Sequence, residues 1–294
     1  MNPKVGTIMG KLSIVAGVRQ EQVTNVAAVK PARGILRKPK KERLYIILDV
    51  TGDPLRRDEI YSQMVRIIGE EYFQARGSVT AKLRQAIGAA NSFLLQENLS
   101  ALPLEQRAGG VTCAVLREGN VYIAQAGPTA AYVSYQGKLK SFPEVPIAEL
   151  TTEEATPLGF KRGMPIRFYR SIVRVGDVVL LTSGSLAQQV SREQIAQALT
   201  GKDVDLALAN LEQLAGEGDA SAMLVRVAPV EEKPKVRPQV AMRPARARVE
   251  ATAKERLPRL DWSSLERRLS SLLVNAWKAT GDFLRRLLPE PVPR

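Results

Sequence analysis

Hydrophobic positions between residues 11 and 227 recur with two different periods. Short runs of apolar and β-branched residues, bounded by turn residues, predict β-strands; these are Ser13–Ala16, Leu44–Asp49, Thr112–Arg117, Asn120–Ala126, Ala130–Tyr135, Pro165–Ser171, Asp177–Thr182 and Ala222–Val227. Apolar residues at helical spacing, together with helix-start signals, predict helices; these are Arg57–Phe73, Val79–Asn98, Ser191–Leu199 and Val204–Ala215. Strands and helix pairs in this order predict a layered α+β domain over residues 1–227 rather than a βαβ repeat.

The pattern changes abruptly after residue 227. Residues 228–259 are rich in Pro, Arg and Lys and carry only scattered apolar residues, so they cannot bury enough surface to offset the entropy of ordering. Eight of the 18 prolines lie between Pro229 and Pro293, which supports a boundary here. We expect residues 228–259 to form a flexible linker between the domain and a C-terminal segment.

The segment 260–294 has a second amphipathic pattern followed by a Pro-rich tail. Over residues 260–288, the leucines, Trp262 and Trp277 fall on one side of a helical projection, and most of the basic residues fall on the other. Such a helix fits an anionic membrane surface or a partner helix, and packing back on the domain is the third alternative.

The amino-acid composition excludes several kinds of catalytic and metal site. The chain has no histidine and a single cysteine, Cys113. Ser-His-Asp and Cys-His triads, His-ligated zinc or haem and an internal disulfide are therefore excluded. One cysteine fits a reducing compartment, and residues 1–11 lack the apolar stretch of a signal peptide, so we expect a cytoplasmic protein, peripheral at the inner membrane face if the C-terminal helix binds lipid.

The net charge of +13 is distributed unevenly. Residues 1–43, 44–227, 228–259 and 260–294 carry +8, −2, +5 and +2, so the centre of the domain is nearly neutral. Much of the excess lies in residues 30–43, between two predicted strands, where a basic loop contains Arg37, Lys38, Lys40 and Lys41. A solvated loop and contact with anionic lipid or an acidic partner are open alternatives; the absence of aromatic residues disfavours nucleic acid.

Seven short motifs follow one another in a characteristic order. They are Gly17-Val18-Arg19 with Gln22-Val23-Thr24, Leu44–Asp49 with Val50-Thr51-Gly52, Ala90-Asn91, Gly110-Val111-Thr112, Gly127-Pro128-Thr129-Ala130, Leu180–Leu186 and Gly218-Asp219-Ala220. Their order resembles the bacterial branch of the PPM (type 2C) metal-dependent protein serine/threonine phosphatases, over about residues 11–227. The resemblance implies a layered β-sandwich flanked by helix pairs.

The same resemblance implies a site with two Mg²⁺ or Mn²⁺ ions held by carboxylates, which hydrolyses phosphoserine or phosphothreonine. It assigns Asp49 and Asp219 to the first metal and Arg19 to the phosphate, but Gly184 stands at the third carboxylate position. The acidic pair of the second metal site is replaced by Val23 and Thr24. We therefore expect any Mg²⁺ or Mn²⁺ to be bound weakly or not at all.

Each retained acid also has a structural interpretation. Asp is common in turns, so Asp49 at the end of a strand and Asp219 after Gly218 can both be explained as turn residues without a metal. Asp53, Asp58 and Glu59 lie close after Asp49 and either substitute as ligands or act as helix N-terminal acids. Whether the chain is an enzyme is open at this point.

Three hypotheses follow from these observations. The first is a pseudophosphatase that binds a phosphoprotein or a regulatory protein. The second is an active phosphatase with a reduced Mn²⁺ or Mg²⁺ site. The third is a nucleic-acid- or membrane-associated adaptor that uses the basic loop, linker and tail.

Overall fold

The domain is built from two antiparallel sheets. A computed structural model describes residues 5–31, 42–201 and 203–229. One sheet has the order β2-β1-β11-β10-β7-β8 and the other the order β3-β4-β5-β6-β9. The strands are β1 Val5–Val15, β2 Val18–Arg19, β3 Val26–Val29, β4 Leu44–Thr51, β5 Ala108–Arg117, β6 Asn120–Ala126, β7 Ala130–Tyr135, β8 Lys138–Phe142, β9 Arg167–Ile172, β10 Val178–Thr182 and β11 Ala220–Pro229.

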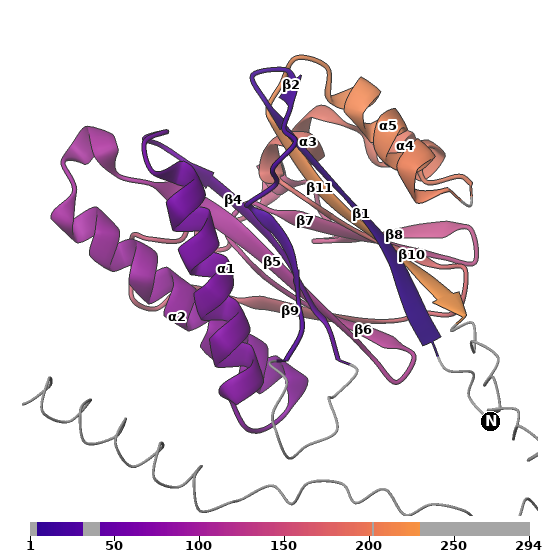
Figure 1. Ribbon diagram of the computed structural model, residues 1–294, viewed down its shortest axis with the longest axis horizontal. Coiled ribbons are helices and arrows are strands. Elements are labelled where there is room, and N and C mark those ends of the chain that lie inside the picture. The colour runs from indigo at the N-terminus through magenta and orange to yellow at the C-terminus, as the bar shows by residue number, and fades with distance from the viewer. Residues whose placement is uncertain (1–4, 32–41, 202, 230–294) are drawn as a thin grey trace, which may run out of the picture. The chain divides into compact units, whose positions relative to one another are not determined.

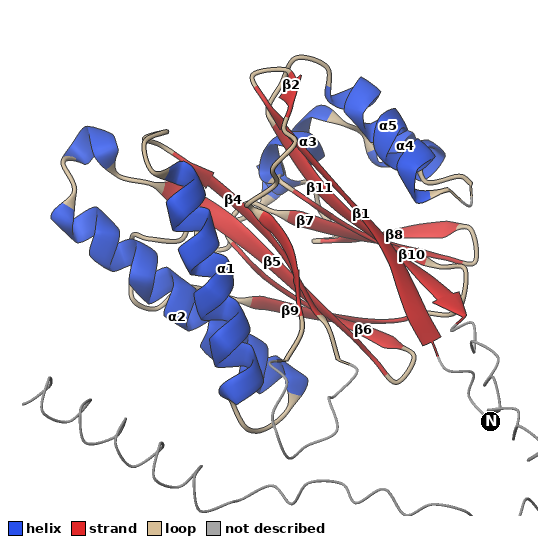
Figure 2. Ribbon diagram, viewed as in Figure 1, coloured by secondary structure: helices blue, strands red, loops and turns tan. Residues whose placement is uncertain are grey.

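Helices cover the outer face of each sheet (Figures 1 and 2). Helices α1 (Arg57–Gln74) and α2 (Val79–Ser100) lie on the β4–β5 sheet, and α3 (Gly184–Gln189), α4 (Arg192–Ala198) and α5 (Val204–Ala215) lie on the β1–β11 sheet. Two short 3₁₀ turns occur at Pro103–Glu105 and Ile147–Glu149. The expected layered β-sandwich flanked by helices is confirmed.

Alternation along the strands explains the layers. In β4, Ile46 and Leu48 belong to the cluster that packs under α1 and α2, whereas Tyr45 and Ile47 belong to the cluster between the two sheets. Successive side chains of a strand point to opposite faces, so a continuous apolar run marks a strand that is buried on both sides. A third cluster, which includes Leu208 of α5, fills the space between the β1–β11 sheet and α3–α5.

The predicted elements are present; apart from β1, three have the predicted bounds, and the others differ by one to four residues at one or both ends. The turns after Arg117 and Tyr135 close hairpins, with the Glu118-Gly119 and Gln136-Gly137 pairs in the left-handed region that such turns require. Ser191 caps α4 in the expected capping box.

The structure corrects the bounds of one predicted strand and adds four short elements. Strand β1 begins at Val5 rather than Ser13 and ends one residue before Ala16, because its pairing with β11 is long-range and two glycines interrupt its pattern. Strands β2, β3 and β8 and helix α3 were not predicted, since runs of two to six residues carry too little periodicity. The second helix group therefore has three members rather than two.

Strand register gives the domain two ends. The site end contains the pairs Thr51–Ala108 and Ile14–Ala220. The basal end contains the pairs Val5–Pro229 and Val29–Leu44 and the β5–β6 hairpin. No helix among residues 5–31, 42–201 and 203–229 is long and apolar enough to cross a membrane. Ala228 and Pro229, the first two residues of the predicted linker, form the end of β11. The rest of the linker, the amphipathic segment with Trp262 and Trp277, and the loop residues Arg37, Lys38, Lys40 and Lys41 lie outside the described residues.

Candidate functional site

Asp49 connects the two halves of the sandwich. It lies near the end of β4, and its half-buried carboxylate Oδ2 accepts a hydrogen bond of 2.6 Å from the backbone N–H of Gly184, the first residue of α3. Burial raises the pKa of Asp49; hydrogen bonds from the amides of Gly184 and Ser185 lower it, and the charge of Asp219 raises it further. The N–H groups at the start of α3 are thus the partners of this carboxylate.

The end of β4 is fixed from the other side by Tyr61 of α1. The Tyr61 hydroxyl donates to the carbonyl of Val50 at 3.0 Å and accepts from its N–H at 3.2 Å. Burial raises the pKa of Tyr61 to about 12, so the hydroxyl stays neutral and keeps both roles. Asp49 therefore sits on a strand end that is held by packing and by hydrogen bonds.

There is no room for a side chain at Gly184, the position where the resemblance leads one to expect a third carboxylate. A Cβ added at Gly184 would overlap the carbonyl oxygen of Pro128 and would lie 3.4 Å from Oδ2 of Asp49. Pro128 follows Gly127, which has φ 71° and whose added Cβ would lie 2.6 Å from the carbonyl oxygen of Gly109. The β6–β7 turn thus packs tightly against the start of α3.

Asp219 and Arg19 each have a protein partner. Asp219 is exposed, and its Oδ1 accepts a 2.6 Å hydrogen bond from the N–H of Ala16 in the β1–β2 turn. Arg19 follows in β2, and its Nη1 pairs with Oε2 of Glu212 on α5 at 2.6 Å. The Arg19 side chain remains 51% exposed, so its guanidinium is accessible from solvent.

Thr24, at one of the positions where the resemblance leads one to expect an acidic ligand, takes part in a hydrogen bond with α1. Thr24 is half-buried, and its hydroxyl donates to Oδ1 of Asp58 at 2.6 Å. Asp58 and Glu59 lie in the first turn of α1, where helix N-terminal acids are expected. Glu59 pairs with Arg56 at 2.8 Å. These acids are occupied near the helix start rather than gathered around Asp49.

Asp53 belongs to a separate ion pair. Its carboxylate lies 3.1 Å from Nη2 of Arg107, and the two side chains are 18% and 9% exposed. Arg107 also donates to the carbonyls of Asp53 and Leu55, which fixes the segment before α1. Within the part of the chain that the structure describes, no three His, Cys, Asp or Glu residues form a group that could hold a metal ion.

Two polar contacts of the site end were not predicted from the sequence. Asn25 donates through Nδ2 to the carbonyl of Leu48 at 3.1 Å and to the hydroxyl of Ser221 at 2.8 Å, which links the two sheets beside Asp49. The hydroxyl of Ser183 caps α3 and also accepts from the N–H of Ser221. Pairing between sheets depends on long-range register, so no local sequence signal identifies these residues.

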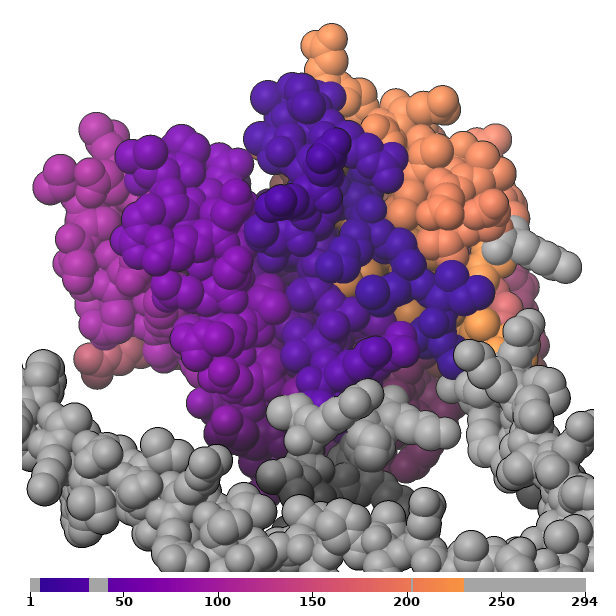
Figure 3. Space-filling view, viewed as in Figure 1, coloured from indigo at the N-terminus to yellow at the C-terminus, as the bar shows by residue number. Residues whose placement is uncertain are grey.

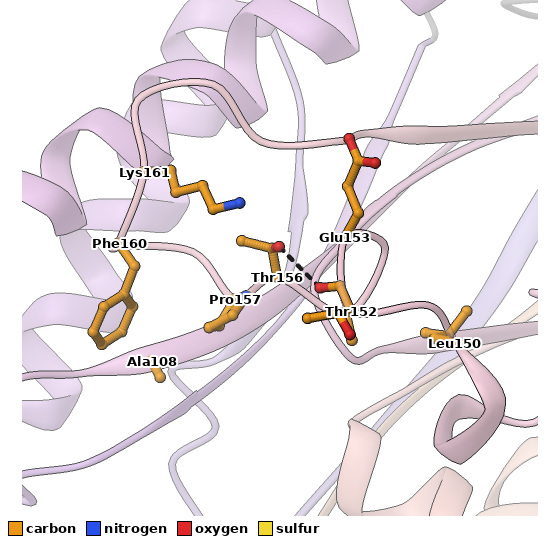
Figure 4. A pocket seen from close by; sticks show the side chains of 9 residues that line it. Ala108, Leu150, Thr152, Glu153, Thr156, Pro157, Phe160 and Lys161 are labelled. Carbon is orange, nitrogen blue, oxygen red and sulfur yellow. Dashed lines mark hydrogen bonds between the residues drawn. The ribbon is translucent and has the colours of Figure 1, made fainter.

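A shallow depression of about 980 Å³ lies under the loop between β8 and β9 (Figure 4). Phe160, Pro157 and Ala108 are apolar residues of its lining, and Thr152, Thr156 and Lys161 are polar ones. Arg19, Asp49 and Asp219 are not among its lining residues. In the space-filling view the β1–β2 hairpin stands between the α1–α2 side and the α4–α5 side at the site end (Figure 3).

Solved structures with the same architecture are serine/threonine phosphatases. The catalytic domain of PstP in complex with two manganese ions has a TM-score of 0.57 and 21% identity, covering 76% of this chain and all of that one. The PPM Ser-Thr phosphatase MsPP from Mycobacterium smegmatis has a TM-score of 0.52 and 18% identity, covering 78% and 100%. PppA, a regulatory component of T6SS in Pseudomonas aeruginosa, has a TM-score of 0.56 and 18% identity, covering 75% and 97%.

The described domain therefore has the fold of bacterial PPM-type serine/threonine phosphatases, as the order of its motifs predicts. Neither a family profile nor a curated protein sequence matches the chain. At these identities the likeness establishes the fold, and function depends on the residues at the site.

Proposed function

We propose that this domain is a pseudophosphatase, a PPM-type fold that acts by binding instead of by hydrolysis. The observation that carries the proposal is the closed position at Gly184, where the Pro128 carbonyl takes the space of a side chain. Gly184 also donates its N–H to Asp49, so the carboxylate is satisfied by a helix N-terminus. The β6–β7 turn would have to move before a carboxylate side chain fitted at position 184. This supports a domain that does not carry out metal-dependent hydrolysis.

The remaining acids support the same conclusion. Hard divalent cations take six or more oxygen ligands, and Mg²⁺ or Mn²⁺ sites rely on several carboxylates. Here Asp49 and Asp219 accept backbone N–H groups, and Thr24 occupies an expected acidic position. The PstP domain contains two manganese ions. We infer that this chain binds manganese or magnesium weakly at best and does not use them for hydrolysis.

Manganese titration calorimetry on the full chain tests this proposal. We expect no saturable heat up to millimolar Mn²⁺, and a rate of phosphate-ester hydrolysis equal to that of the Asp49→Ala variant, because two occupied carboxylates do not form a cation site. Micromolar binding that disappears in Asp49→Ala, accompanied by Mn²⁺-dependent hydrolysis, would instead establish an active phosphatase with a reduced site.

Arg19 supplies the ligand chemistry of the proposed module. Its guanidinium is half exposed and has a planar set of donors that matches phosphate oxygens. Its present partner, Glu212, forms an exposed ion pair, and such pairs contribute only about 0–1 kcal/mol. A phosphate group can displace Glu212 at little cost, which supports a phosphorylated protein as the partner.

Titration of a phosphothreonine peptide against the unchanged protein, Arg19→Gln and Glu212→Gln tests the role of Arg19. We expect Arg19→Gln to weaken binding by about tenfold, since hydrogen bonds to a charged group are lost. Glu212→Gln is expected to strengthen binding by about threefold, because it removes the competing carboxylate. Fluorescence anisotropy with the unphosphorylated peptide is the control. Equal affinity of all three proteins for both peptides contradicts a phosphate-binding role.

A further inference from the structure

The basal end of the domain combines basic and apolar groups on a surface opposite Asp49. The basal face comprises Lys30, Arg43, the Arg117–Asn120 hairpin, the Tyr135–Lys138 hairpin and the segment 170–177, all at the same end of their strands. Segment 174–177 runs beside the end of β11, since Gly176 donates to the carbonyl of Val227. Strand β11 ends here, beside the start of β1 (Figure 1), and its last residue, Pro229, is paired with Val5.

The charge of the basal face is predominantly positive. Six basic residues lie there, namely Lys30, Arg43, Arg117, Lys138, Arg170 and Arg174. The acids nearby are engaged: Glu118 pairs with Arg117 at 3.1 Å, and buried Asp177 accepts the N–H of Arg174 at 2.7 Å. Glu42 accepts the hydroxyl of Tyr72 at 3.1 Å.

Arg170 and Arg174 are exposed and are oriented by aromatic rings. Their guanidinium carbons each lie 5.5 Å from a ring centroid, that of Tyr122 for Arg170 and that of Tyr135 for Arg174. Two exposed apolar side chains lie among them, Ile172 at 59% and Val175 at 45% exposure. The face thus offers fixed positive charge together with apolar groups that water solvates poorly.

The two strongly basic stretches of the sequence, 32–41 and 228–259, are joined in the chain to strands that end at the basal face. The residues between β3 and β4, 32–41, contain five Lys or Arg and no acid, and residues 228–259 begin where β11 ends. Neither stretch has an aromatic residue for base stacking. The amphipathic pattern of 260–288, with its two tryptophans, follows in the chain, and apolar and basic groups together are what an anionic lipid surface attracts.

We propose that the basal face is a docking surface for anionic membranes, with the site end directed away from the lipid. Residues 230–259 follow β11 in the sequence, so a membrane-binding segment at 260–288 would be tethered through the end of the domain that carries the basal face. Stable attachment to a membrane generally needs two binding elements. In this proposal the basal face is one and the C-terminal segment is the other.

Sedimentation of the full chain with phosphatidylcholine vesicles, with and without phosphatidylserine, tests this proposal. The informative variant is Arg170→Gln with Arg174→Gln. The matched control is Arg56→Gln with Arg162→Gln, which removes two exposed arginines that do not belong to the basal face. Each basic residue near an anionic surface contributes about 1 kcal/mol, so we expect about 30-fold weaker partitioning for the basal variant and no change for the control. Lys30→Gln with Lys138→Gln is the second basal pair, should the first reduce folding.

We expect partitioning to require phosphatidylserine and to weaken with added salt. Three results overturn the proposal. One is the absence of binding to phosphatidylserine vesicles. Another is an equal effect of the basal and control variants, which would assign all binding to the C-terminal segment. The third is tighter binding to a duplex oligonucleotide at the same salt, lost in the basal variant, which would make the face a nucleic-acid surface.

Discussion

Gly184→Asp, the substitution that would place a second carboxylate beside Asp49, is expected to destabilise this domain and not to activate it. The added Cβ meets the carbonyl of Pro128. That carbonyl belongs to a turn with little freedom, because the Gly127 carbonyl accepts Nη2 of Arg167 at 2.8 Å and the N–H of Thr129 at 3.1 Å. Forced overpacking of this kind costs about 1–3 kcal/mol.

The new carboxylate adds an electrostatic cost. It begins 3.4 Å from Oδ2 of Asp49, whose pKa is already raised by burial. A second negative charge there disfavours ionisation of both groups. We expect a total loss of about 3 kcal/mol or more, a large part of the stability of a domain.

Three companion variants separate the two contributions. Gly184→Ala carries the steric part alone, and Gly184→Asp with Asp49→Asn removes the charge repulsion while keeping the steric part. Ser185→Ala changes the next residue without adding an atom. Guanidinium unfolding followed by far-ultraviolet circular dichroism is the measurement, since both tryptophans lie beyond residue 229. An unchanged midpoint for Gly184→Asp, with Mn²⁺-dependent hydrolysis, would show that the site opens readily.

The sequence predicts the layers of this fold because the layers follow from local patterns. Continuous apolar strands such as Leu44–Asp49 and amphipathic helices such as Arg57–Phe73 specify which faces are buried. The order of the motifs then specifies how the elements connect. Short elements are not predicted from the sequence. Helix α3 has six residues, which are too few to show helical periodicity, and its start is defined by the Ser183 cap and by the hydrogen bond to Asp49.

For the site, the resemblance predicts missing carboxylates, and that prediction remains untested. The sequence of Leu180–Leu186 shows a glycine at position 184, but the Pro128 carbonyl that fills the space beside it comes from a turn more than 50 residues earlier. The same is true of Arg19, whose partner Glu212 lies nearly 200 residues away in the chain. Contacts between distant segments require the three-dimensional register, which one sequence does not encode locally.

The Ala90-Asn91 motif illustrates how a residue recognised only by resemblance acquires a physical role. Asn91 lies on α2, accepts the N–H of Gly159 through Oδ1 at 2.9 Å and donates to the carbonyl of Lys161 at 2.7 Å. Asn98, two turns later, holds the same loop. Polar side chains on α2 thus hold the β8–β9 loop against the helix.

Asn98→Ala is expected to be the most damaging polar substitution at this loop. The Asn98 side chain is buried; Nδ2 donates to the carbonyls of Arg107 at 2.7 Å and Gly159 at 2.9 Å, and Oδ1 accepts the N–H of Arg107 at 2.8 Å. Alanine leaves three backbone groups without a partner. Each unsatisfied buried group costs about 1–3 kcal/mol, so we expect a loss of about 3 kcal/mol even if water reaches one of them.

Asn98→Ala is expected to loosen the β8–β9 loop locally, in addition to lowering the stability of the whole domain. Gly159 has φ 90° and packs against Leu94, so the loop keeps its path only while Asn98 and Asn91 hold it. Hydrogen exchange should accelerate at Gly159 and Arg107 before the rest of the domain opens. Gln85→Ala, on the same helix, removes an exposed hydrogen bond to Glu71 and should change stability by less than about 0.5 kcal/mol. Equal effects of Asn98→Ala and Gln85→Ala on the unfolding midpoint would show that the loop does not depend on this side chain, and that packing of Leu94 and its neighbours is sufficient to hold it.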